Sequence, residues 1–107
     1  MLVAPISADR PALLPSAAAR RVSNQIARAF RGTYGARTGL RTIVRAVALQ
    51  MIADGSTPEA VADVFERCVL DHPARLVADP HNLVTGEPHS AALVALAREC
   101  VAEAAHP

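Results

Sequence analysis

The sequence Ser-Thr-Pro-Glu-Ala-Val-Ala-Asp-Val-Phe-Glu-Arg-Cys-Val-Leu, residues 56–70, contains the clearest helix signal in the chain. A hydroxyl residue, an early proline and Glu59, three positions after Ser56, are typical of a helix start with a capping box. We therefore expect Ser56 to cap a helix that ends before Pro73. The apolar positions recur with a helical period and predict an inward face made of Val61, Val64, Phe65, Cys68 and Val69.

A first amphipathic helix is expected earlier in the chain, from Ser16 to about Arg31. Ser16 follows Pro15 and has the hydroxyl group of a good N-cap. The inward face of this helix is predicted to be Val22, Ile26 and Phe30. Its opposite side carries polar residues: Arg20, Arg21, Asn24, Arg28 and Arg31. This separation of apolar and polar sides indicates a helix that packs on a core and faces water.

A second helix is expected from about Thr38 to Ala53, where an Asp-Gly pair stops it. The stretch before it contains several glycines and is predicted to be a loop: Gly32, Gly35 and Gly39. The inward face of the helix is predicted to be Leu40, Ile43, Val44, Val47 and Met51. Three arginines at a spacing of four residues form one stripe along it: Arg37, Arg41 and Arg45.

The last helix is expected from about Pro88 or Ser90 to Ala105. Its inward face is predicted to be Leu93, Leu96, Ala97, Cys100 and Val101. The segment before it, residues 71–89, fits either a short helix over 74–78 or an irregular crossing with several turns. We leave both alternatives open for this segment.

The first fifteen residues form an arm interrupted by prolines. Its many apolar side chains suggest that it docks on its own domain or on a partner: Leu2, Val3, Ile6, Leu13 and Leu14. The chain is therefore predicted to be all-α, with an arm over residues 1–15 and a single helical domain over residues 16–107. We expect that domain to be a bundle of about four helices.

The composition supports a helical domain and excludes several classes of protein. Of 107 residues, 51% are hydrophobic, 20% are charged and only 3% are aromatic, which favours helices over β-sandwiches. The chain is too short for a multidomain enzyme, and no apolar run approaches the roughly 20 residues of a membrane span. No basic leader precedes an apolar stretch, and Cys68 and Cys100 are expected to be free thiols. We therefore expect a cytoplasmic protein that does not bind membranes.

All eleven basic residues are arginines, and most of them lie in the first half of the chain. Residues 1–53 contain eight arginines and one acid, whereas residues 54–107 contain three arginines and nine acids. The overall net charge of +1 therefore conceals two halves of opposite charge.

One interpretation of this asymmetry is a site for a phosphate-bearing ligand, nucleic acid above all, or a nucleotide. Residues 28–45 gather five arginines, a tyrosine and three glycines around an expected helix N-terminus. Guanidinium groups bind phosphate in bidentate geometry, and backbone N–H groups at a helix N-terminus favour anions. An exposed tyrosine can stack on a base. The expected ligand-binding residues are Arg28, Arg31, Tyr34, Arg37, Arg41 and Arg45.

The alternative interpretation is a protein-interaction or oligomerisation module. The basic first and second helices would then pair with the acidic third helix, whose outer stripe is Glu59, Asp63 and Glu66. Such pairing is possible within one molecule, across a homodimer or with an acidic protein partner. The same stripe argues against a helix-turn-helix, because the acidic helix would be the recognition helix and phosphate would repel it.

No catalytic motif is present in the sequence. A Walker A loop requires lysine, and the chain has neither Gly-x-Ser-x-Gly nor His-Glu-x-x-His nor Cys-x-x-Cys. Histidines and acids are frequent between the third and last helices, at Asp71, His72, Asp79, His81, Glu87 and His89. These residue types could ligate a metal, but their spacing matches no metal-site motif, and Asp-His-Pro fits ordinary turn chemistry. We expect a regulatory or binding role with no catalysis, no cofactor and no metal.

Overall fold

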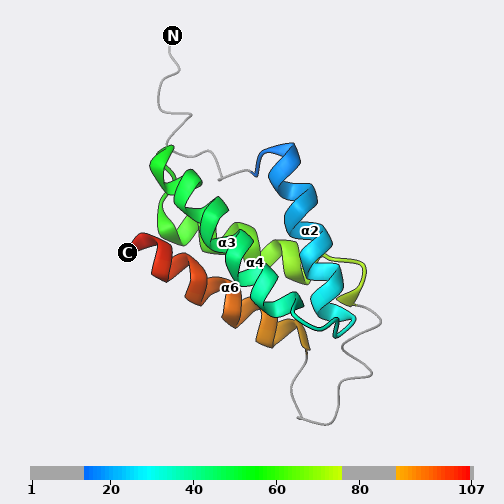
Figure 1. Cartoon of the computed structure of the whole chain (residues 1–107). Helices are drawn as coiled ribbons and strands as arrows, with labels where there is room; N and C mark the ends of the chain where they lie inside the picture. Colours follow the sequence, from blue (N-terminus) through cyan, green and yellow to red (C-terminus); the bar gives the residue numbers. More distant parts are fainter. Residues whose placement is uncertain (1–13, 76–88, 107) are drawn as a thin grey trace.

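The computed structural model describes residues 14–75 and 89–106, which form four α-helices around one core (Figure 1). The helices are α2 (Ser16–Phe30), α3 (Ala36–Ala53), α4 (Pro58–Leu70) and α6 (His89–Ala105). These residues contain no strand, and the predicted all-α fold is confirmed. None of the described helices is both long enough and apolar enough to cross a membrane.

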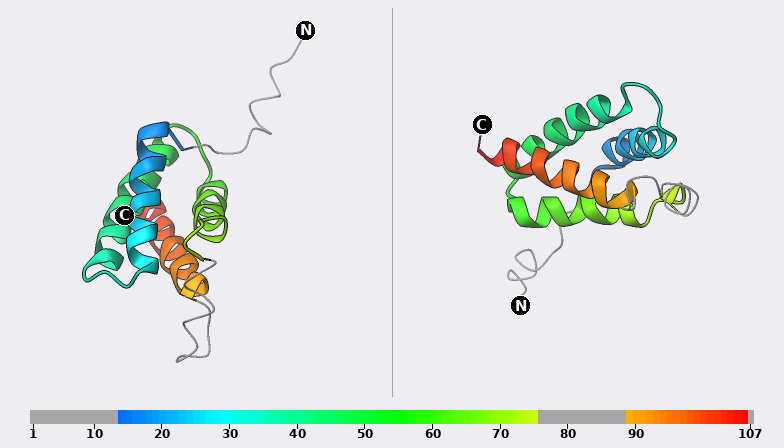
Figure 2. Two further views of the ribbon diagram at one scale, coloured as in Figure 1. Left: turned by 90° about the vertical axis from the view of Figure 1, so that its right-hand side faces the viewer. Right: turned by 90° about the horizontal axis from the view of Figure 1, so that it is seen from below.

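Helices α3 and α6 lie side by side and run in the same direction, as their colours show in Figure 1. Helix α4 runs the opposite way and packs mainly against α6, as Figure 2 shows from two further directions. Helix α2 packs mainly on α3. Because α6 also contacts α2, the helix that comes last in the sequence touches each of the other three.

Every described helix contributes to one continuous core. The largest fully buried side chains include Phe65, Ile26, Leu40 and Leu93. The predicted inward faces are confirmed, with small differences in depth. Three of the expected core side chains are only partly buried, although they pack against the core: Val47, Cys68 and Leu96.

The start of α2 differs from the prediction because Pro15, not Ser16, is its N-cap. Pro15 has an extended backbone, and its carbonyl oxygen accepts the N–H of Ala19 at 2.8 Å. Ser16 is therefore the first helical residue, and the helix begins one residue earlier than it would if Ser16 were the cap. No side chain caps this end of the helix.

Helix α3 starts at Ala36, two residues earlier than predicted. Its N-cap is Gly35, whose φ of 78° lies in the left-handed region that favours glycine. Gly39 therefore lies inside the helix and not in the preceding loop. A Cβ at this position would approach the Gln25 side-chain oxygen of α2 to 2.8 Å, so a larger residue here would require the Gln25 side chain to move.

The cap of α4 is Thr57, so the prediction of Ser56 is wrong by one residue. The Thr57 hydroxyl accepts the Ala60 N–H at 3.2 Å. Ser56 instead completes the end of α3, because its N–H donates to the Met51 carbonyl beyond Gly55, whose φ is 109°. This is the Schellman arrangement of a helix C-terminus.

Thr57→Ala is expected to destabilise the domain more than Ser56→Ala, because Thr57 is the cap of α4. Thr57→Ala should lower the free energy of unfolding by about 1 kcal/mol, because it removes the hydroxyl acceptor at the α4 N-terminus. That corresponds to a melting temperature lower by about 4–8 °C in a domain of this size. Ser56→Ala is the matched control, with less than half of that effect. A larger effect at Ser56 in thermal unfolding would contradict the assignment.

The remaining predictions concern residues outside the described part of the chain. Of the arm, the structure describes Leu14 and Pro15, and of the segment 71–89 it describes residues 71–75 and 89. The choice between a short helix over 74–78 and an irregular crossing lies outside the described residues.

Candidate phosphate-binding site

A five-residue turn, residues 31–35, joins α2 to α3 and is held at both ends by backbone hydrogen bonds. At the end of α2, the N–H of Gly32 donates to the Ala29 carbonyl and that of Thr33 to the Arg28 carbonyl. Gly32 has a φ of 73°, as a Schellman turn requires. The turn therefore places the last residues of α2 beside the first residues of α3 in a defined geometry.

A polar pocket of about 310 Å³ lies at this turn. It is lined by Ala29, Gly32, Thr33, Gly35, Arg37, Thr38 and His89. The N-terminal ends of α3 and α6 both contribute to it, since Arg37 and His89 lie in their first turns. Helix N-termini present backbone N–H groups and carry partial positive charge, so the pocket favours an anion.

Four of the six predicted ligand-binding residues lie on or beside the turn. Arg28 is in the last turn of α2, and Arg31 and Tyr34 are in the connection itself. All three side chains are exposed, Tyr34 completely. Neither Arg28 nor Arg31 forms an ion pair with any residue that the structure describes. Arg37 points to the pocket, with its Nη2 atom 3.4 Å from Nε2 of His89.

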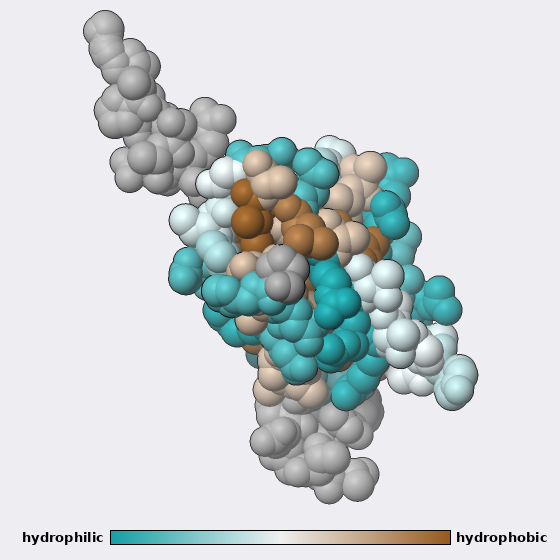
Figure 3. All heavy atoms as spheres, turned by 60° about the vertical axis from the view of Figure 1, so that its left-hand side comes forward, coloured by the Kyte–Doolittle hydropathy of each residue, from teal (hydrophilic) through white to brown (hydrophobic). Residues whose placement is uncertain are grey.

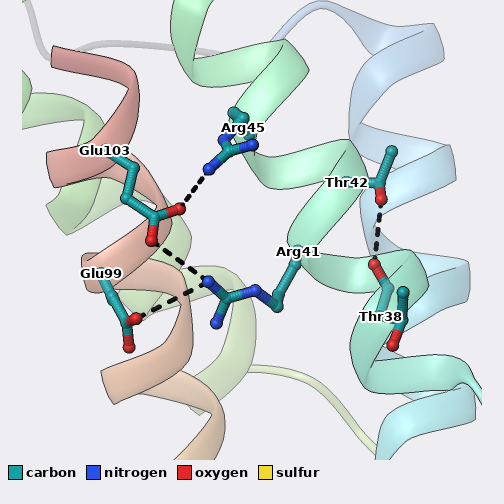
Figure 4. A network of polar contacts seen from close by, with 6 residues as sticks. All are labelled: Thr38, Arg41, Thr42, Arg45, Glu99 and Glu103. Atoms are coloured by element: carbon teal, nitrogen blue, oxygen red, sulfur yellow. Dashed lines mark hydrogen bonds and ion pairs between the residues drawn. The ribbon is translucent and has the colours of Figure 1, made fainter. Parts of the chain in front are cut away.

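The other two predicted residues, Arg41 and Arg45, face α6 (Figure 4). Arg45 Nη2 lies 2.6 Å from Glu103 Oε1, and Arg41 Nη2 lies 3.2 Å from Glu103 Oε2 and 3.6 Å from Glu99 Oε1. Both arginine side chains remain about half exposed, at 41% and 56%. A ligand phosphate at these arginines would therefore compete with carboxylates that are already present.

The acidic stripe on α4 pairs with α6 and not with the basic helices. Arg98 Nη2 lies 2.7 Å from Glu66 Oε1 and 3.0 Å from Asp63 Oδ1. These hydrogen bonds raise the pKa of the Arg98 guanidinium above its ordinary value. Helix α6 thus carries carboxylates that bind α3 and a guanidinium that binds α4. The expected pairing of α3 with the acidic third helix is replaced by pairing with α6.

Three polar residues of the pocket were not among the predicted ligand-binding residues: Thr33, Thr38 and His89. The two threonines alternate with the glycines and arginines of the turn, and that pattern was the available signal. His89 was considered only as a metal ligand, because the contact between the starts of α3 and α6 is not visible in the sequence.

The histidines and acids of residues 71–89 do not form a metal site among the described residues. No three His, Cys, Asp or Glu side chains converge there in a way that could hold an ion. His72 instead attaches the chain after α4 to α2: its Nε2 lies 3.1 Å from the Ser23 carbonyl oxygen, and its Nδ1 accepts the Ala74 N–H. Asp79, His81 and Glu87 lie outside the described residues.

Both cysteines are free thiols, and neither has the environment of a nucleophile. Burial is the main cause that raises the pKa of Cys68 and of Cys100. A raised pKa keeps the thiol protonated and therefore unreactive near neutral pH.

We expect the native thiols to react with iodoacetamide several-fold more slowly than the same thiols in urea, because burial limits access to the sulfur and the raised pKa lowers the thiolate fraction. Mass spectrometry of peptides after timed labelling measures both rates. Cys68, which is partly exposed, should react before Cys100, which is buried. Labelling of either native thiol at the urea rate would contradict its assigned burial.

The described residues define a small all-α domain with a polar pocket, lined by Arg37, beside the turn between α2 and α3. No protein family, curated protein or solved structure that was compared with the chain matches it.

Proposed function

We propose that this chain is a non-catalytic binding domain that takes a phosphate-bearing ligand, nucleic acid foremost, at the turn between α2 and α3. The observation that carries the proposal is the polar pocket at this turn, which Arg37 and His89 line from the first turns of α3 and α6. The exposed Arg28 and Arg31 lie next to the pocket residues Ala29 and Gly32 in the sequence. Free thiols in the described chain agree with a reducing compartment, so we place this role in the cytoplasm.

The residues at this turn suit a phosphate better than a carboxylate or a neutral ligand. Arginine offers a planar fork of donors that matches two phosphate oxygens, and it tolerates partial burial. The threonine hydroxyls and the backbone N–H groups of the α3 first turn add donors without adding charge. Tyr34, which is fully exposed beside them, is available to stack on a base.

The test is a salt titration of binding to fluorescein-labelled single-stranded and duplex oligonucleotides, followed by fluorescence anisotropy. The paired variant Arg28→Ala, Arg31→Ala should weaken binding by about tenfold or more, the equivalent of about 1.4 kcal/mol. It should also reduce the slope of log K against log salt by about 1.8 on duplex DNA, or about 1.4 on single strands. A variant that forms fewer phosphate contacts releases fewer counterions on binding, and its affinity therefore depends less steeply on salt.

The matched control is Arg20→Ala, Arg21→Ala, because these two exposed arginines lie on the same helix at its other end. The control removes the same charge and should retain most of the affinity. Equal losses in the two paired variants would show that only net charge matters and would reject the site. The absence of binding to any oligonucleotide at low salt would reject the nucleic-acid form of the proposal, and titration with nucleotides would then test the remaining form.

A second candidate function is a protein-interaction or oligomerisation module. It is favoured because some of the described arginines have carboxylate partners and others do not. Arg41, Arg45 and Arg98 have carboxylate partners, whereas no described carboxylate pairs with the arginines of α2. Those arginines are suited to an acidic surface on a second copy or on another protein. Sedimentation over a range of concentrations should then show an oligomer that dissociates in salt, and a monomer under all conditions would exclude the homodimer.

A further inference from the structure

Helices α2 and α3 diverge from their connecting turn (Figure 1). Side chains of both helices line a groove toward the ends that lie far from this turn. Its volume is about 290 Å³. Ile43, Val47 and Met51 of α3 lie on one side, and Pro15 and Ala18 on the other. The groove lies at the opposite end of α2 from the polar pocket, so the two sites are separate.

The groove has an apolar wall and a charged rim. A cavity of about 150 Å³ lined by apolar side chains holds a benzene-sized molecule, so this volume accommodates about two aliphatic side chains. The rim carries one cation, Arg21, and one anion, Asp54, and the Gln50 side-chain amide donates to the Asp54 carboxylate at 3.1 Å. Apolar side chains also form a distinct area bordered by polar residues on the face of the molecule shown in Figure 3. An occupant of the groove should therefore be apolar with one charge of each sign.

We propose that the part of the N-terminal arm that precedes Leu14, residues 1–13, occupies this groove. The arm ends where the groove begins, because Leu14 already packs against the core and Pro15 lines the groove. The arm also has the composition that the groove requires. It carries four aliphatic side chains, Leu2, Val3, Ile6 and Leu13, and a single pair of opposite charges at Asp9 and Arg10.

The length of the arm is sufficient for this assignment. An extended proline-containing chain advances about 3.1 Å per residue, so Ile6 lies up to roughly 25 Å along the chain from Leu14. The part of α3 that lines the groove, from Ile43 to the cap at Asp54, is about 17 Å long at 1.5 Å per residue. Ile6 therefore reaches every part of the groove, and Asp9 and Arg10 reach its charged rim.

The arm of the same chain is favoured over that of a second copy because it is attached at the edge of the groove. A short tether gives an effective concentration in the millimolar range, far above that of a second molecule in a dilute solution. Docking within one chain is therefore expected to be independent of protein concentration.

Tryptophan fluorescence tests the proposal in the full-length chain, which contains no tryptophan of its own. In Ile6→Trp, the single indole should emit at shorter wavelength than a free peptide and should be several-fold less accessible to acrylamide. Adding Ala46→Arg should shift the emission to that of the free peptide, because Ala46 is an exposed residue that lines the groove. The matched control is Ala102→Arg, at another exposed alanine, on α6, which should leave the emission unchanged.

Each outcome of this experiment decides the proposal. An exposed indole in Ile6→Trp alone would overturn it, and so would a protected indole that ignores Ala46→Arg. Protection that is lost on about a hundredfold dilution would assign the groove to a second copy and would also overturn it. The chain without the introduced tryptophan gives an independent check by NMR. There, the triple change Leu2→Ser, Val3→Ser, Ile6→Ser should move the amide resonances of residues 43–54 and leave those of residues 31–37 in place, and the reverse pattern would contradict the assignment.

Discussion

Phe65→Ala is expected to lower the free energy of unfolding by about 3–5 kcal/mol. Phe65 lies on α4 and is only 1% exposed, and it is the largest of the fully buried side chains. Its removal takes away apolar burial and leaves a cavity that the surrounding helices fill only in part. Because a small domain is stable by about 5–15 kcal/mol, this single change is expected to remove a large part of the stability.

Urea unfolding followed by circular dichroism measures the effect of this substitution. The matched control is Leu49→Ala, since Leu49 is an aliphatic residue of α3 with 44% of its surface exposed. The control should change the free energy of unfolding by less than about 1 kcal/mol, because surface substitutions have small effects. Similar losses in the two variants would mean that Phe65 is not a core side chain.

Gly35→Val is expected to lower the free energy of unfolding by about 2 kcal/mol. Gly35 is the N-cap of α3 and has a φ of 78°, a conformation that a β-branched residue strongly disfavours. No atom lies within 4 Å of a Cβ built at this position, so the cost comes from the backbone and not from a clash. The same change should weaken the proposed phosphate binding, because Gly35 sets the path of the turn that lines the pocket.

Gly35→Asn separates the conformational effect from the loss of glycine itself. Asparagine tolerates the left-handed region better than other residues with a side chain, so its cost should be less than half that of valine. Thermal unfolding of both variants gives the comparison. Equal costs for the two substitutions would show that the left-handed backbone is not the cause.

Much of this fold could be predicted from the sequence, because each helix carries its own apolar period. Val22, Ile26 and Phe30 of α2 are all buried, as their spacing predicts. The prediction of a helix end was less accurate where two neighbouring residues could both serve as the cap. Ser56 and Thr57 both have a hydroxyl, and only the hydrogen bonds of the α3 C-terminus show that Ser56 belongs to the earlier helix.

The neighbours of each helix could not be predicted, and the interpretation of charge depended on them. Arg41 and Arg45 are four residues apart on α3, and Glu99 and Glu103 are four residues apart on α6. Matching of these two pairs requires that the helices lie side by side and run in the same direction. Local sequence does not specify that arrangement, so the acidic third helix was chosen as the partner on charge alone.

The candidate site was predicted in part, for the same reason. Arg28, Arg31, Tyr34 and Arg37 lie on or beside the same turn because they are close in sequence. His89 joins the pocket through a contact between residues that lie 52 positions apart. Such contacts depend on how the whole bundle packs, so local sequence patterns predict them poorly.

The position of α6 has a consequence for the way in which this unit is made. Five of its residues complete the core, at Leu93, Ala97, Cys100, Val101 and Ala104. While the ribosome is still adding these residues, the three earlier helices have an uncovered apolar side. A nascent chain that stops before residue 89 is therefore expected to be a client of chaperones, and the domain acquires its native state only when the last of its helices has been released.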